Sequence, residues 1–205
     1  MSSLNASNFS HPSATPVLNR QHSFDWLKGH VISSLNAFFS GHFTEIDQAF
    51  VVWGALTLFM FSLGQFSTLS WTTQAILDAG LTGIGIATTS GLTWAIACQA
   101  KLRWVVLLWA MLMAAGSLIT AYGIFCGHAL ILLNLCPLWL GLCAVGYGAM
   151  AAGMKSRCFT AAFWVHLSAM LFLSHTASYQ FFTSGLVIAL TLFFFSIVPW
   201  DREEP

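Results

Sequence analysis

The amino-acid sequence predicts an all-α, multi-pass membrane protein with six transmembrane helices, preceded by an amphipathic interfacial helix. Hydrophobic residues make up 57% of the 205 residues and charged residues only 7%, whereas soluble domains carry roughly 25% charged residues. The apolar residues also come in long blocks, and a helix that crosses the bilayer needs about 20 of them. No long stretch alternates polar and apolar residues, as the strands of a transmembrane barrel would.

The N-terminal region divides into two parts. Residues 1–22 are rich in Ser, Asn and Pro without apolar periodicity, which is typical of a disordered tail, here on the cytoplasmic side. Residues 23–43 predict an amphipathic helix in the membrane interface, because apolar residues recur there at steps of three and four. These apolar residues are Phe24, Leu27, Val31, Leu35 and Phe38. The same face could instead dock on a partner or a neighbouring subunit.

The transmembrane domain is expected over residues 44–200, with a short cytoplasmic tail at 201–205. We predict spans at about 48–69, 73–98, 102–126, 129–154, 157–178 and 180–200. The string TEID at 44–47 has the form of a capping box, with Thr44 as the cap and Asp47 three residues later. The first span should therefore begin close to Thr44.

The basic residues predict the orientation of these spans. With six spans, all of them fall before the first, after the last, or between spans two and three and spans four and five. They are Arg20, Lys28, Lys101, Arg103, Lys155, Arg157 and Arg202. By the positive-inside rule, both termini should lie on the cytoplasmic or equivalent side.

Small residues recur every four positions in two of the spans. Ala79, Gly83, Ala87 and Gly91 form one such stripe, and Ala144, Gly148 and Ala152 form another. Stripes of this kind let neighbouring helices approach closely, so we expect both to be packing faces.

Polar residues inside the spans are the candidates for a substrate pathway, since such residues are rare in membranes and often functional. From the residues alone these candidates are Gln65, Asp78, Ser117, Asn134, His166 and His175. Pro137 frees a backbone carbonyl next to Asn134, and the threonines 88–89 and Thr120 add hydroxyls. These groups either line a narrow polar path or make ordinary hydrogen bonds between helices.

Two interpretations of Asp78 are open at the level of sequence. The carboxylate lies about five residues into the second span, so it could be solvated at the interface. Alternatively, it could line an outer vestibule with His128 and His175, where the three groups would relay protons or hold a metal ion.

Several functional classes are disfavoured by the sequence. A net charge of zero provides no basic surface for nucleic acid. The five cysteines have neither a CxxC pair nor zinc-ligand spacing. His166 and His175 are nine residues apart and so point to opposite helix faces, which argues against their sharing a haem. With no reactive constellation apparent, we expect a protein that is not an enzyme and has no metal or cofactor.

Short strings in the sequence resemble the acetate uptake transporter family, the bacterial acetate/succinate permeases and their fungal relatives. They are GALTLFMFSL at 54–63, AAGSLI at 114–119, GMKSR at 153–157 and SGLVIALTLFFF at 184–195. The family's Asn-Pro-Ala-Pro-Leu-Gly-Leu signature has no counterpart, and residues 47–54 read DQAFVVWG instead. The resemblance implies six spans, a homo-oligomer and transport of small monocarboxylates with protons. It adds Gly116, beside Ser117, to the pathway residues.

The sequence therefore predicts an integral membrane transporter or channel that passes a small solute, a weak monocarboxylic acid being the class that the resemblance implies. Its expected partners are the lipid bilayer, the solute and further copies of itself. The competing hypothesis is a non-catalytic subunit or assembly factor of a larger membrane complex.

Overall fold

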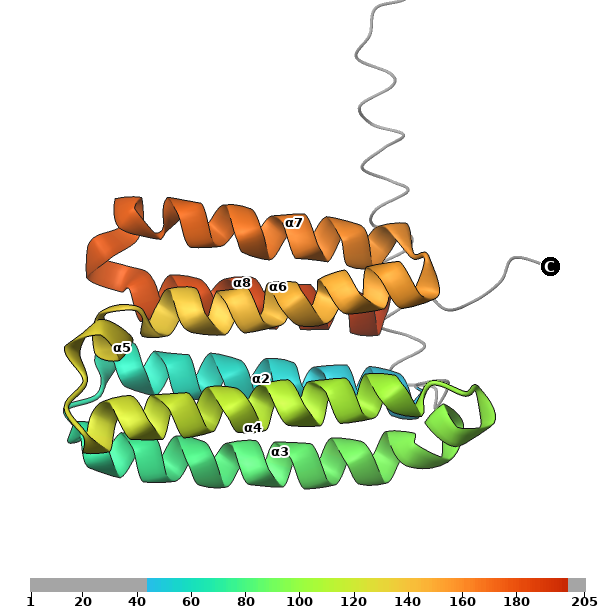
Figure 1. The fold of residues 1–205 in the computed structure, drawn as a ribbon, viewed down its shortest axis with the longest axis horizontal. Coiled ribbons are helices and arrows are strands. Elements are labelled where there is room, and N and C mark those ends of the chain that lie inside the picture. Colours follow the sequence, from blue (N-terminus) through green and yellow to red (C-terminus); the bar gives the residue numbers. More distant parts are fainter. Residues whose placement is uncertain (1–43, 199–205) are drawn as a thin grey trace, which may run out of the picture. The chain divides into compact units, whose positions relative to one another are not determined.

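The computed structural model describes residues 44–198, and every regular element in that range is helical. In chain order these are α2 (Glu45–Phe66), α3 (Trp71–Gln99), α4 (Arg103–Phe125), α5 (Ala129–Leu133), α6 (Leu135–Met154), α7 (Arg157–Phe172), the 3-10 helix η1 (Leu173–Tyr179) and α8 (Gln180–Ile197). The long helices run side by side (Figure 1). The predicted interfacial helix and the two predicted tails lie outside the described residues.

Five helical stretches of the described chain are long and apolar enough to cross a membrane. They are Glu45–Phe66, Trp71–Gln99, Arg103–Phe125, Leu135–Met154 and Arg157–Ile197. The last stretch joins α7, η1 and α8 and is 41 residues long. Thr176 interrupts it with non-helical dihedral angles (φ −112°, ψ 33°), and α7 and α8 lie alongside each other on either side of this turn (Figure 1). Such a set of helices is compatible with a membrane protein, as the sequence predicted.

The start of α2 confirms the predicted capping box. The backbone N–H of Asp47 donates to Thr44 Oγ1 at 3.1 Å, and the backbone N–H of Thr44 donates to Asp47 Oδ2 at 3.0 Å. These reciprocal bonds satisfy two donors that the first turn of a helix leaves unpaired.

The predicted span at 129–154 is wrong at its beginning. The chain forms a separate five-residue helix, α5, and the long helix α6 begins only at Leu135. Pro137 explains the break, because its ring excludes a helix hydrogen bond to the preceding turn and is best accommodated near a helix start. The side-chain amide of Asn134 donates instead to the carbonyl of Leu130 at 2.8 Å.

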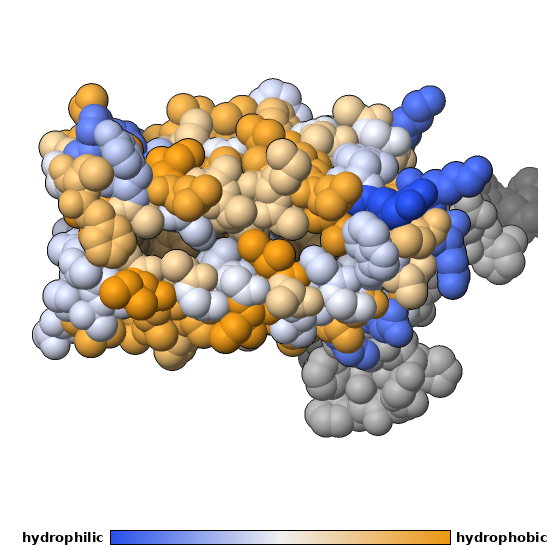
Figure 2. Space-filling view, turned by 60° about the horizontal axis from the view of Figure 1, so that its bottom comes forward, coloured by the Kyte–Doolittle hydropathy of each residue, from blue (hydrophilic) through white to orange (hydrophobic). Residues whose placement is uncertain are grey.

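The basic side chains of the described residues gather at one end of the helices. The α3–α4 loop and the α6–α7 loop lie at the end where α2 starts and α8 finishes (Figure 1). Lys101 and Lys155 lie in these loops, and Arg103 and Arg157 begin the helices that follow them. We call this the basic end. In Figure 2, apolar side chains cover much of the visible face, and the hydrophilic ones lie toward the two ends, with the larger group at one of them.

Aromatic rings lie over glycines where helices meet. A methyl group added at Gly54 of α2 would come within 2.7 Å of Phe193 on α8, and one at Gly185 of α8 would clash with Phe61 on α2. Lipid provides no hydrophobic force between helices, so close contacts of this kind carry much of their association. α2 and α8 accordingly share the most extensive interface of the described chain.

The remaining helices differ in how tightly they pack. Tyr147 of α6, Phe159 of α7 and Phe195 of α8 are almost completely buried and in mutual ring contact. α3 and α4 bury few residues by comparison. The helical hairpin that α3 and α4 form therefore closes less completely on the rest of the helices, and this leaves space between them.

The stripe of small residues on α3 does not pack as predicted. Ala79, Gly83, Ala87 and Gly91 are all exposed, and no atom lies within 4 Å of a methyl group placed at Gly83 or Gly91. The inward face of α3 carries Gly85 instead, which accommodates the ring of Trp53.

The stripe on α6 is a packing face over part of its length. Ala144 is buried, and Gly148 lies against Phe163 of α7, with 3.1 Å available to an added methyl group. Ala152, the last member of this stripe, is exposed.

We predict that Gly185→Ala destabilises the protein and that Gly83→Ala does not. The added methyl group at position 185 meets the backbone-proximal part of Phe61, so a cost of about 1–3 kcal/mol is expected for overpacking. At position 83 the methyl group meets open space, and alanine favours helix by about 0.5–1 kcal/mol over glycine. Thermal unfolding of the two purified variants in the same detergent measures this difference. Equal midpoints would contradict the close α2–α8 contact.

Candidate functional site: a cavity between the helices

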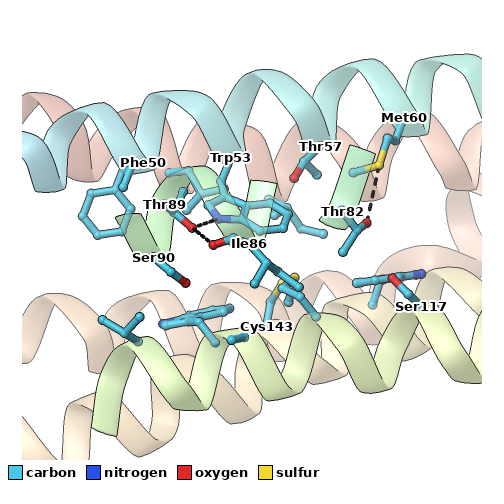
Figure 3. A pocket seen from close by; sticks show the side chains of 18 of the residues that line it. Phe50, Trp53, Thr57, Met60, Thr82, Ile86, Thr89, Ser90, Ser117 and Cys143 are labelled. Atoms are coloured by element: carbon cyan, nitrogen blue, oxygen red, sulfur yellow. Dashed lines mark hydrogen bonds between the residues drawn. The ribbon is translucent and has the colours of Figure 1, made fainter. Parts of the chain in front are cut away.

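A cavity of about 670 Å³ lies between α2, α3, α4, α6 and α8. The inward face of α3 forms one wall, since its lining residues recur at helical spacing. These include Gln74, Asp78, Thr82, Ile86, Thr89 and Thr93. Phe50, Trp53, Thr57 and Met60 extend into the space from α2, and Ser117 from α4 (Figure 3).

The cavity follows α3 over its whole length. Its lining includes Trp71 and Phe181 at the end opposite the basic end, and Ala100, Leu102 and Ser156 at the basic end. At 1.5 Å per residue, the 29 residues of α3 extend for about 43 Å. The lining thus reaches from one end of the helices to the other.

Most of the cavity wall is apolar, with a large aromatic share. The rings that line it are Phe50, Trp53, Phe61, Trp71, Trp109, Trp139, Tyr147 and Phe181. Two of the indoles are held by hydrogen bonds: Trp53 Nε1 donates to Thr89 Oγ1 at 3.1 Å, and Trp109 Nε1 approaches Met150 Sδ at 3.1 Å. The aromatic wall is therefore anchored.

Hydroxyl groups form a column along the α3 wall (Figure 3). Thr89 Oγ1 donates to the Gly85 carbonyl at 2.8 Å, and Thr93 Oγ1 donates to the Thr89 carbonyl at 2.8 Å. Thr82 Oγ1 lies 4.0 Å from Met60 Sδ. Because these donors are engaged locally, the oxygens remain as acceptors toward the cavity.

Three buried polar atoms of the lining have no hydrogen-bond partner within the described part of the chain. They are Asp78 Oδ1, Thr120 Oγ1 and the hydroxyl of Tyr147. Buried polar atoms are normally hydrogen-bonded, so these three residues combine a place in the cavity lining with an unmet hydrogen bond.

Asp78 is the one charged side chain that the described residues contribute to the cavity lining; no Lys, Arg, His or Glu of residues 44–198 lines it. Gln74 lies one turn before it and contacts Gly64 of α2, and Thr82 lies one turn after it and contacts Met60. Asp78 consequently stands level with residues 60–64 of α2, toward the end opposite the basic end.

The structure brings two of the predicted pathway residues, Asp78 and Ser117, to this cavity. Gln65 lies at the end of α2, where its side chain donates to the Ser178 carbonyl at 3.0 Å and accepts from Phe182 N at 3.4 Å. Gly116 packs against Trp139 and Leu142 of α6. Asn134 is exposed at the α5–α6 break.

The histidines lie away from the cavity lining. His166 is completely buried in α7; its Nδ1 is 2.8 Å from the Ala162 carbonyl, and its ring lies 5.0 Å from that of Tyr147. His128 and His175 are exposed, beside Tyr122 and Phe172 respectively. Within residues 44–198, no three His, Cys, Asp or Glu side chains come together in a metal-binding group.

Several lining residues were not among the sequence-based candidates, notably Trp53, Thr82 and Tyr147. The spacing of Gln74, Asp78, Thr82, Thr89 and Thr93 was a usable signal, because these positions share one face of an α-helix. The aromatic residues gave no such signal, since rings also face lipid throughout this chain.

Comparisons with known protein families, with curated proteins and with solved structures find no match to this chain.

Cysteine labelling tests whether water fills the cavity. In a variant whose five native cysteines are replaced by alanine, we expect Thr82→Cys to react with a water-soluble maleimide in liposomes, because its side chain lines the cavity. Ala87→Cys, on the exposed face of the same helix, should react at least about tenfold more slowly, since a thiol in lipid does not form the reactive thiolate. Equal rates would show that the cavity is dry or that Ala87 also faces water.

Proposed function

We propose that the protein crosses the membrane six times and passes a small solute through the cavity between α2, α3, α4, α6 and α8. The observation that carries this proposal is the extent of the cavity, whose lining continues from one end of the helices to the other. A single carboxylate, Asp78, lies within that lining and supplies an ionisable group for coupling.

The arrangement of α7 and α8 supports six crossings. The two helices have 16 and 18 residues and lie alongside each other around the break at Thr176 (Figure 1). Counted separately, they return the chain to the basic end, where α2 starts. By the positive-inside rule, this end then faces the cytoplasm or its equivalent.

Asp78 is the group proposed to couple transport to protons. Ionisable side chains inside membranes commonly lie in water-filled cavities and mark ion or proton pathways. A carboxyl group in this position changes the charge of the lining when it gains or loses one proton, because no other charged side chain of residues 44–198 lines the cavity.

The side chains that line the cavity also restrict which solutes can pass. The sequence resemblance implies a monocarboxylate, and that stays a prediction. Within the described part of the chain no basic side chain lines the cavity to hold an anion, so a weak acid would pass in its neutral, protonated form. Narrowness and hydroxyl groups would then provide the selectivity.

We predict that purified protein in liposomes moves at least one small weak acid or amine together with, or in exchange for, protons. A pH-sensitive dye inside the liposomes reports the movement after addition of acetate, succinate, benzoate or a substituted ammonium. With the substituted ammonium, Asp78→Asn should abolish the proton movement, because the amide cannot carry a proton in exchange. A weak acid that passes in its neutral form carries its own proton and should still give a signal in this variant.

Glu45→Gln is the matched control for this experiment. It removes a carboxylate of the same chain that is exposed at the start of α2 and does not line the cavity. Its signal should equal that of the unaltered protein. If no solute of the panel gives a signal above that of empty liposomes, the transport proposal is wrong.

The uncovered stripe on α3 favours a second candidate function, that of a subunit which packs against another membrane helix. Such stripes form close helix contacts in membranes, and here Gly83 and Gly91 contact nothing within the described chain. Native gels test this: Gly83→Leu should shift an assembly to lower mass. Gly80→Leu, on an adjacent open face, should not. Unchanged mobility of both variants would count against this candidate.

A further inference from the structure

We infer that the solute which fits this cavity is an amphipathic organic cation, such as a substituted ammonium that carries apolar groups. This inference rests on the proposed function and names its substrate class. The argument depends on the charge of the cavity, on the rings around that charge and on the rest of the wall.

The described residues that line the cavity give it a negative or zero charge. Asp78 is the one charged side chain that residues 44–198 contribute to the lining. An anion beside Asp78 would meet a like charge without a compensating base from the described residues, whereas a cation would pair with the carboxylate.

Aromatic rings line the cavity between the level of Asp78 and the end opposite the basic end. Trp71 lies two turns before Asp78 on α3, and its ring is 5.8 Å from that of Phe181 on α8. Phe181 in turn lies 6.4 Å from Phe61, on the α2 segment opposite Asp78. Ring faces attract cations, and indole does so most strongly. The proposed site comprises the carboxylate and these three rings.

The rest of the wall selects for apolar groups on the cation. Away from Asp78 the lining is mainly aromatic and aliphatic, with only scattered hydroxyls. A small inorganic cation would lose its hydration shell here without enough oxygens to replace it. A substituted ammonium brings its own apolar surface and needs only one counter-charge.

One carboxylate can hold either a proton or the cation, but not both together. Binding of the cation therefore requires that Asp78 release its proton, and return of the proton displaces the cation. The site accordingly predicts exchange of an organic cation for a proton.

A pair of probes that differ only in charge tests this inference. Phenyltrimethylammonium is the cation, and tert-butylbenzene is its neutral isostere, with carbon in place of nitrogen. Equilibrium dialysis against the full chain in lipid nanodiscs, with empty nanodiscs subtracted, gives both affinities. We expect the cation to bind about 10- to 100-fold more tightly than the isostere, the range typical of a charge-assisted contact.

Substitutions test whether the preference for the cation arises at Asp78 and the rings near it. Asp78→Asn should remove the preference for the cation while the isostere still binds, which also reports that the cavity is intact. Glu45→Gln should leave both affinities unchanged. Trp71→Leu should lower the preference by about 2- to 5-fold, as expected for loss of one cation–ring contact.

The outcomes separate this inference from the transport proposal. Equal binding of cation and isostere, tighter binding of benzoate, or a preference that survives Asp78→Asn would overturn the inference. In that case, proton-coupled uptake of acetate alone would still support the transport proposal. Asp78-dependent binding of the cation without any uptake into liposomes would support the site and overturn transport.

Discussion

The structure depends on aromatic rings packed directly over glycines. In lipid, helices are not driven together by exclusion of water, so van der Waals contact must hold them. Phe61 on Gly185 joins α2 to α8, Trp53 on Gly85 joins α2 to α3, and Trp139 on Gly116 joins α4 to α6. Trp53, Phe61 and Trp139 also line the cavity. The contacts that hold the helices together therefore also determine the shape of the cavity wall.

The fold was largely predictable because its determinants are local. Helix positions follow from apolar blocks, the start of α2 follows from the capping box of Thr44 and Asp47, and the common end of the two basic loops follows from charge placement. The sequence did not predict the break before α6, although Pro137 lies close to it. In a sequence, a proline in the first turn of one helix looks the same as a proline inside a longer helix. Only the dihedral angles and hydrogen bonds around Asn134 distinguish the two cases.

The site was predictable only in part. In a membrane, apolar residues face the lipid as well as the core, so hydropathy does not tell which face of a helix is buried. On α3, the stripe through Gly83 and the stripe through Thr82 have the same helical period. In water the more polar stripe would be solvated, but here the polar stripe faces the cavity, whereas Gly83, Ala87 and Gly91 are exposed and do not line it. Likewise, nothing local places His166 in the α6–α7–α8 core, or Gln65 on the backbone of η1 and α8; long-range packing decides both.

The unequal lengths of the helices have a consequence for the surrounding lipid. α7 has 16 residues, about 24 Å of helix, whereas α3 has 29 residues, about 43 Å. The hydrocarbon core of a typical bilayer is about 30 Å thick. In the proposed topology, α7 matches the hydrocarbon core because η1 continues it up to the break at Thr176, whereas α3 must tilt or extend into the headgroups. Bilayer thickness thus becomes a variable of this protein's energetics: thicker, sterol-rich membranes would relieve the mismatch at α3, and lipids with shorter chains would increase it.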